Sequence, residues 1–253
     1  IAYYLASPLN LLLLFFPDKL LPTGVFILIL TKIGLISVTS TYFFKHTFQL
    51  KNYWAFLLGV SFALSGFVID FQLCLMWLDS VILLPLLLTQ LHQLVNVKAP
   101  ATKLKRQLLL TFVLIWLTNF YTGYMVVIFG FIYFIYLLIV TKQSFKLLWL
   151  YFKNAVFGGL LNAWLLVPTA LELLQGKVEQ AKIDFNWDFS FPLQNLFAKF
   201  ISGSFSFKEM SYGMPNFYFG SILLVLLLTF FLNRQISRKE KLCAFIMLSL
   251  LFV

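Results

Sequence analysis

The chain has 253 residues, of which 61% are hydrophobic and only 11% are charged, and its mean hydropathy is +0.92. A water-soluble domain has about 45–50% apolar and about 25% charged residues, so this composition excludes one and predicts an integral membrane protein. The net charge of +10 is carried by short Lys/Arg clusters between apolar runs. Such clusters form no continuous basic face, so no nucleic-acid partner is expected.

A helix that crosses a bilayer needs about 20 apolar residues, and most uncharged runs of the chain have that length. Residues 1–20 carry a shorter apolar run that Pro17 closes, so they are predicted to form an interfacial or re-entrant segment. Ser7-Pro8 within it is typical of a helix N-cap followed by proline. The predicted spans are 22–43, 53–69, 80–96, 106–120, 123–140, 148–170 and 217–233, with an eighth that starts near 242.

The two spans around Asn119 are predicted to form a tight hairpin. As a single helix, the uncharged run 107–141 would be about 50 Å long, which exceeds the hydrocarbon thickness of about 30 Å. The turn chemistry in this run is supplied by Asn119 and Gly123. The fold predicted for residues 1–253 is thus a single all-α transmembrane domain, a polytopic bundle of seven to eight helices.

The charged residues separate into two sets of alternating loops. One set holds most of the Lys and Arg and a single acid, Glu240, whereas the other set holds the remaining acids. By the positive-inside rule the basic loops are cytoplasmic, and the acidic loops, including the long region 171–216, are extracytoplasmic. The aromatic residues beside polar ones in that region, around Trp187, suit either stacking on a sugar or contact with lipid headgroups.

Lys32 lies inside the first predicted span, where an ammonium group costs about 2.5 to 3.5 kcal/mol near the bilayer centre. In one interpretation it faces a wet cavity and binds a lipid phosphate or an acid such as Asp70. In the other, the helix starts later and Lys32 snorkels to the interface.

Asp70 and Asp79 bracket the outer end of a predicted helical hairpin. On one continuous helix these two carboxylates would point in opposite directions, so they converge only if the chain bends between them. Asp79-Ser80 is also a good N-cap for the following helix, and capping is compatible with a ligand contact. The alternative to a functional role for Asp70 is snorkelling at a helix end.

The sequence lacks a nucleotide-binding loop, a His-Glu metal motif and a nucleophile elbow. His46, His92, Cys74 and Cys243 have no ligand at suitable spacing, so packing roles are expected for them. No cofactor is therefore expected, and the need for a divalent cation is left open.

Several segments, taken together and in order, resemble the YfhO family of bacterial membrane proteins, which are multi-pass glycosyltransferases of the GT-C class. The resembling segments are Tyr4–Asn10 with Phe16-Pro17, Thr31–Leu35, Ala63–Phe67, Met76–Asp79 with Leu84–Leu86, Asn119–Met125 and Gly213–Gly220. The resemblance implies a bacterial plasma-membrane enzyme that transfers a sugar from an undecaprenyl-phosphate carrier to a cell-envelope polymer, such as lipoteichoic acid, on the outer face.

The resemblance also implies roles for individual residues. Lys32 would stabilise the departing lipid phosphate, and Asp79 and Asp70 would orient sugar or acceptor hydroxyls. The matching outward rim supplies candidate substrate-binding residues, namely Asn10, Trp77, Asn119, Tyr121, Tyr124, Asn216 and Tyr218. The usual GT-C base lies in the first outward loop, and because the chain starts at Ile1 and ends within an apolar run, it is expected to be a fragment that begins after that loop.

Two other functions fit the same residues. A transporter or flippase of a lipid-linked sugar would also place intramembrane charge and broken helices along its substrate path. A non-catalytic scaffold would tolerate replacement of Lys32, Asp70 and Asp79. Membrane lipids are expected partners in every case.

Overall fold

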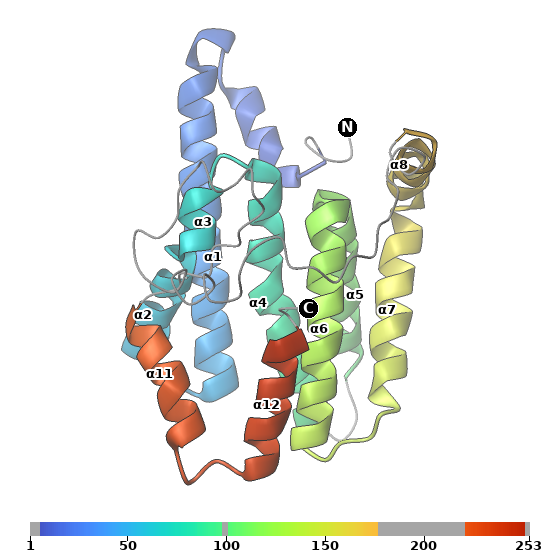
Figure 1. Cartoon of the computed structure of the whole chain (residues 1–253). Coiled ribbons are helices and arrows are strands. Elements are labelled where there is room, and N and C mark those ends of the chain that lie inside the picture. Colours follow the sequence, from blue (N-terminus) through green and yellow to red (C-terminus); the bar gives the residue numbers. More distant parts are fainter. Residues whose placement is uncertain (1–5, 98–100, 177–220, 251–253) are drawn as a thin grey trace.

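The computed structural model describes residues 6–97, 101–176 and 221–250, and these residues form a helical bundle without a strand (Figure 1). Two 3₁₀ helices come first, and ten α-helices follow among the described residues. They are η1 (Pro8–Phe15), η2 (Asp18–Leu20), α1 (Leu21–Phe48), α2 (Asn52–Ala63), α3 (Gly66–Asp70), α4 (Leu75–Asn96), α5 (Thr102–Thr118), α6 (Phe120–Val140), α7 (Leu147–Leu161), α8 (Ala163–Gly176), α11 (Ser221–Leu232) and α12 (Arg238–Leu250).

Three described helices are long and apolar enough to cross a membrane: Asp18–Phe48, Leu75–Asn96 and Phe120–Val140. A fourth crossing results if the bent pair α7 and α8 counts as one span. They correspond to four of the predicted spans. The predicted total of seven to eight is not reached by this criterion because α2, α5, α11 and α12 have only 12, 17, 12 and 13 residues.

The predicted span 53–69 is broken in two, so its prediction as one helix was wrong. The helix α2 ends at Ala63 with Leu64 in the cap position, and Ser65 has an extended backbone (φ −63°, ψ 156°) before α3 begins at Gly66. Serine competes for backbone hydrogen bonds and glycine loses much conformational entropy in a helix, so Ser65-Gly66 is a weak point in an otherwise apolar run.

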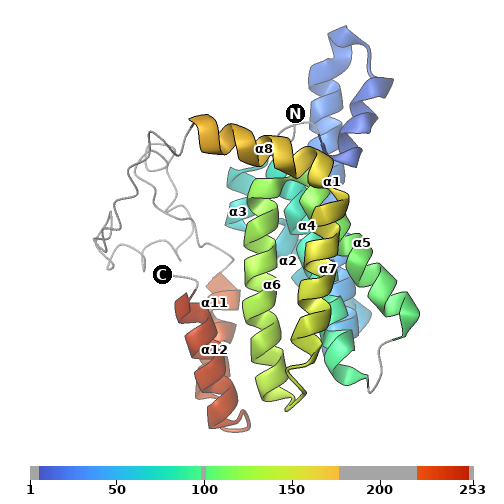
Figure 2. The same cartoon turned by 90° about the vertical axis from the view of Figure 1, so that its right-hand side faces the viewer.

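The predicted span 148–170 bends by 80° between α7 and α8. Asn162 lies at the bend, and its backbone N–H donates to the carbonyl of Gly159 at the end of α7. Its side-chain Nδ2 donates to the carbonyl oxygens of Val113 on α5 (3.0 Å) and Gly158 (2.8 Å). Asn162 thus stabilises the break and attaches it to α5, and α8 turns across the end of the bundle (Figure 2).

The hairpin predicted around Asn119 is confirmed. Asn119 is the single residue between α5 and α6, and its extended backbone (φ −162°, ψ 121°) reverses the chain. Its Oδ1 accepts the N–H of Thr122 at 2.9 Å and so caps α6. Beside it, Gly123 lets the helices approach closely, because a Cβ there would lie 2.9 Å from the Ile115 carbonyl oxygen.

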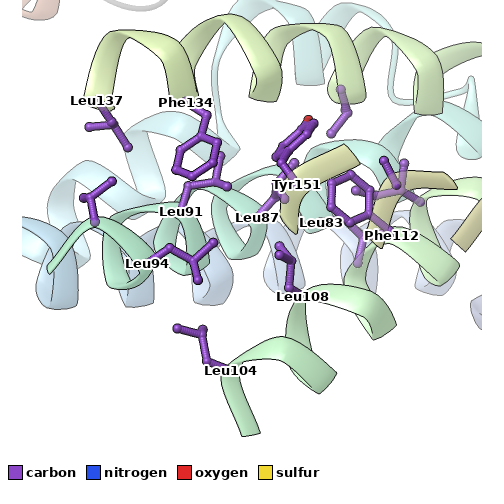
Figure 3. Packing of buried hydrophobic residues seen from close by; sticks show 14 of the residues in the cluster. Leu83, Leu87, Leu91, Leu94, Leu104, Leu108, Phe112, Phe134, Leu137 and Tyr151 are labelled. Carbon is purple, nitrogen blue, oxygen red and sulfur yellow. The ribbon is translucent and has the colours of Figure 1, made fainter. Parts of the chain in front are cut away.

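The main hydrophobic core lies where α4, α5, α6 and α7 meet (Figure 3). Leu87 and Leu91 of α4 pack there with Phe112 of α5, Phe134 of α6 and Tyr151 of α7, and all five are fully buried. The Tyr151 hydroxyl donates to the Val127 carbonyl oxygen at 2.6 Å, which satisfies the polar atom of this aromatic anchor.

A second, smaller core joins the first four α-helices. Ile36, Ala63, Val68 and Leu78 are buried together, one from each of α1 to α4, and Leu9 of η1 packs against them. This contact fixes η1 against the bundle at the end where α4 begins. Because α1 and α4 are both long enough to cross a membrane, this small core lies between two candidate spans.

The chain reverses so that its basic loops gather at one end. The connections α1–α2, α6–α7 and α11–α12 lie at the lower end of the bundle in Figures 1 and 2. They contain Lys51, Lys142, Lys146 and Arg234. The break between α3 and α4, the α5–α6 turn and α8 lie toward the opposite end of the bundle.

Candidate functional site

The centre of the candidate site is an ion pair between α1 and α4. Lys32 Nζ lies 2.7 Å from Asp79 Oδ2 and also donates to the Leu75 carbonyl oxygen at 2.9 Å. The side chains of Lys32 and Asp79 are only 0% and 3% exposed. Lys32 is eleven residues inside α1, about 17 Å along its axis. Of the two interpretations of Lys32, the one in which the helix starts later and Lys32 snorkels is therefore wrong, because α1 starts at Leu21.

Asp79 does not cap its helix, which corrects one prediction. The helix α4 starts at Leu75 with Cys74 in the cap position, so Asp79 lies one turn inside it. Its carboxylate binds the Lys32 ammonium group instead of the free N–H groups of the first turn. The acid partner of Lys32 is thus Asp79, whereas the sequence suggested a lipid phosphate or an acid such as Asp70.

Ser7 joins the ion pair from the N-terminal segment. It is buried and caps η1, where its Oγ accepts the N–H of Leu9 at 3.3 Å. Its side chain also lies close to the Asp79 carboxylate. The sequence predicted Ser7 as an N-cap, but it gave no signal for a contact with a residue so distant in the chain.

A second polar connection begins at Ser80, the next residue of α4. Its Oγ lies 2.6 Å from Thr122 Oγ1 of α6, and Asn119 Oδ1 accepts from both the N–H and the hydroxyl of Thr122. Ser80, Thr122 and Asn119 are all buried. Neighbouring residues on a helix point about 100° apart, so Asp79 binds α1 while Ser80 binds α6.

Aromatic side chains lie close in the chain to this polar centre, with Trp77 two residues before Asp79 and Tyr121 directly before Thr122. We call Phe67, Phe71, Trp77, Tyr121 and Tyr124 the aromatic rim. The Trp77 ring lies 6.5 Å from Phe67, 5.2 Å from Phe71 and 6.5 Å from Tyr121, and Tyr121 contacts Tyr124 edge-on at 5.7 Å. Tyr121 and Tyr124 are 38% and 40% exposed. The rim therefore offers accessible ring surface next to the buried ion pair.

The remaining predicted site residues are Asp70, Asn10, Asn216 and Tyr218. Asp70 ends α3, and the turn Phe71–Cys74 separates it from α4, so the bend expected between the two aspartates is present. Burial raises the pKa of the Asp70 carboxyl group above its ordinary value. Asn10 belongs to η1, where its N–H donates to the Ser7 carbonyl oxygen at 3.0 Å. Asn216 and Tyr218 lie outside the described residues.

The described ranges also contain His, Cys, Asp and Glu residues, which are common metal ligands. Within them, no three His, Cys, Asp or Glu side chains lie close enough to share a metal ion. Cys74 and Cys243 are both free thiols.

The whole sequence matches a known protein family. The sequence profile described as bacterial membrane protein YfhO matches residues 1–253. The chain belongs to the YfhO family. Membership of this family agrees with the apolar helices of the structure and identifies a bacterial membrane protein. Neither a curated protein nor a solved structure is significantly similar to the chain.

Proposed function

We propose that this YfhO-family protein is a GT-C-type membrane glycosyltransferase. Its donor would be a sugar linked to a polyprenyl phosphate such as undecaprenyl phosphate, and its acceptor a cell-envelope polymer such as lipoteichoic acid. The observation that carries the proposal is the buried Lys32–Asp79 ion pair next to the aromatic rim. Charged residues inside a membrane bundle are costly, so they are typical of functional sites.

The proposed reaction is a displacement at the anomeric carbon of the donor sugar. An acceptor hydroxyl oxygen forms the new bond to this carbon, and its proton passes to a carboxylate. The bond between the carbon and the phosphate oxygen breaks, and its electron pair stays on the phosphate. A cation near the departing phosphate lowers the barrier because negative charge develops there in the transition state.

Lys32 is the proposed cation for the lipid phosphate. In the structure the Lys32 ammonium group is paired with the Asp79 carboxylate. Donor binding would therefore require Lys32 to give up part of its ion pair with Asp79 and to bind the phosphate instead. Asp79 would then be free to accept hydrogen bonds from sugar or acceptor hydroxyls. Ser7 lies on η1, so entry to the pair would involve a small displacement of that segment.

The surrounding residues would bind the sugar. The exposed faces of Tyr121 and Tyr124, with Trp77 beside them, offer apolar surface on which a sugar ring stacks. Asn119 holds the start of α6 and would position these tyrosines. Asp70, close in sequence to Phe71 of the rim, would bind sugar hydroxyls, and Asn10, Asn216 and Tyr218 complete the proposed set.

The proposed topology places this site outside the cell. The basic loops at the opposite end of the bundle would be cytoplasmic by the positive-inside rule, with seven to eight crossings in total. The aromatic rim would then face the extracytoplasmic side, where the cell-envelope acceptor is found.

The proposal is tested with the full-length protein in liposomes, using a polyprenyl-phosphate donor with a labelled sugar and purified lipoteichoic acid as acceptor. We expect Lys32→Ala and Asp79→Asn to reduce transfer per folded molecule at least 100-fold, and Lys32→Arg to restore part of it. Lys45→Ala, which removes an exposed lysine from the same helix, should leave transfer unchanged. Movement of the labelled donor across the bilayer without transfer would instead identify a flippase.

A further inference from the structure

A cavity of about 430 Å³ lies between α1, α4 and α5. Its lining on α4 begins at Leu83, one turn after Asp79, and continues away from the ion pair to Gln93. It is therefore separate from the candidate site and lies on the side of the basic loops. Nothing in the proposed transfer reaction requires it.

The lining of the cavity changes in polarity along the bundle. On α4, Leu83 and Leu86 come first and are followed by Gln90 and Gln93. On the antiparallel α5 the order is reversed, so Gln107 lies toward the basic end and Leu114 toward the ion pair. The cavity is polar at its basic end and apolar toward the middle of the bundle, which is the polarity profile of a lipid anchored at the basic side.

The cavity opens sideways between α1 and α5. Both helices pack on α4, and the residues that line the cavity at its edges keep much of their surface accessible: Val38 and Tyr42 on α1 and Leu110 on α5 are 64%, 42% and 58% exposed. A molecule in the hydrocarbon can therefore enter from the membrane. Amide side chains that face such an opening are costly unless something binds them.

One acceptor atom in the cavity wall, the side-chain oxygen of Gln90, is not used by the hydrogen bonds of the described residues. Gln90 Nε2 donates to Thr111 Oγ1 at 2.8 Å, and the Thr111 hydroxyl donates to the Gln107 carbonyl oxygen at 3.0 Å. Gln90 Oε1 is buried and finds no hydrogen-bond donor within the described part of the chain. A buried acceptor without a partner costs about 1–3 kcal/mol, which a ligand hydroxyl would recover.

Two exposed cations flank the polar end. Lys45 follows Tyr42 by one turn of α1, and Arg106 directly precedes Gln107 on α5. The polar end thus combines positive charge with amide and hydroxyl groups. These features suit a headgroup that carries a phosphate for the cations and a hydroxyl for Gln90 Oε1.

We propose that this cavity binds an anionic phospholipid from the leaflet at the basic end of the bundle. Its hydroxyl-bearing headgroup lies against Gln90, Gln93 and Gln107, and one acyl chain extends between Leu86 and Leu114.

The first test measures the melting temperature of the full-length protein in detergent micelles. Phosphatidylglycerol should raise it in a saturable manner, whereas phosphatidylcholine and inorganic phosphate at the same concentration should not. The double variant Gln90→Leu/Gln107→Leu should weaken the apparent affinity at least tenfold, a loss of about 1.4 kcal/mol. Gln235→Leu makes the same chemical change at an exposed position near the basic end and should have no effect.

The second test does not depend on the folding of a variant. Phosphatidylglycerol with a diazirine midway along one acyl chain is photolysed with the unmodified protein, and the labelled peptides are sequenced. We expect label on α4 near Leu86 or on α5 near Leu114, well above that on exposed α7 residues such as Trp149. Equal labelling of all these helices, or an equal thermal effect of phosphatidylcholine or inorganic phosphate, would overturn the proposal.

Discussion

Lys32 and Asp79 are 47 positions apart in the sequence and form a fully enclosed ion pair between two helices that are each long enough to cross a membrane. Lys32 also binds the carbonyl oxygen of Leu75, so the ammonium group bridges the side chain and the backbone of α4. These two polar contacts fix the relative position of α1 and α4, and η1 is held at the same end by the packing of Leu9.

The ion pair predicts that single and double substitutions lower the free energy of unfolding by different amounts. Removal of one partner leaves the other charge buried without compensation, so Lys32→Ala should lower the free energy of unfolding by about 3–5 kcal/mol. Replacement of both partners in Lys32→Met/Asp79→Leu removes both charges and should cost much less than either single change. Unfolding in mixed detergent micelles is measured for Lys32→Met, Asp79→Leu and the double variant, and additive losses would show that the two groups do not interact.

Asn119 predicts a separate and smaller loss of stability. Asn119→Ala removes the side-chain acceptor for the N–H of Thr122 at the start of α6. Loss of an N-cap costs about 0.5–2 kcal/mol, and Asn119→Ser, which keeps an uncharged acceptor, should retain more of the stability. Thermal unfolding of the two variants provides the comparison. If alanine and serine behave alike, the cap is not the reason for asparagine at this position.

Sequence reasoning identified the polar centre because charge is rare in an apolar chain. Lys32 was singled out by its cost inside a membrane span, and Asn119 by its turn chemistry within a run too long for one helix. The pairing of Lys32 with Asp79 could not be predicted in this way. It depends on how α1 and α4 are placed side by side, and a tertiary contact of this kind has no local sequence pattern.

The errors in the helix predictions also have a physical cause. Hydropathy predicts where the chain is apolar, but single polar residues decide where a helix breaks. Asn162 binds the carbonyl oxygens of Val113 and Gly158, whereas Ser65 has an extended backbone and forms no side-chain cap hydrogen bond. Asp79-Ser80 has the composition of a cap, yet α4 gains an extra turn because both residues find partners on other helices. Tertiary hydrogen bonds therefore overrode the local pattern at Asn162 and at Asp79-Ser80, whereas the break at Ser65-Gly66 reflects the weak helix propensity of these two residues.

Close packing of α5 and α7 predicts that Gly158 cannot be replaced. A Cβ at Gly158 would lie 2.9 Å from the Phe112 carbonyl carbon and 3.0 Å from the Val113 nitrogen, and these backbone atoms cannot move aside as a flexible side chain does. Gly158→Ala should therefore lower the melting temperature by several degrees. Gly34→Ala is the control, since a Cβ there meets nothing within 4 Å and alanine favours the helix. Equal melting temperatures would contradict the packing of α5 on α7.

The charge distribution predicts the orientation of the protein in the cell membrane. Lys19 in η2 and Ser144 in the α6–α7 connection are both exposed and lie near opposite ends of the bundle. In a Cys74→Ser/Cys243→Ser background, we expect Lys19→Cys to react with an impermeant maleimide on intact spheroplasts. Ser144→Cys should react only after the membrane is opened, because its loop carries Lys142 and Lys146 and such loops stay in the cytoplasm. Reaction of Ser144→Cys in closed spheroplasts would place the aromatic rim in the cytoplasm. Transfer of a sugar to an external polymer would then be impossible at this site.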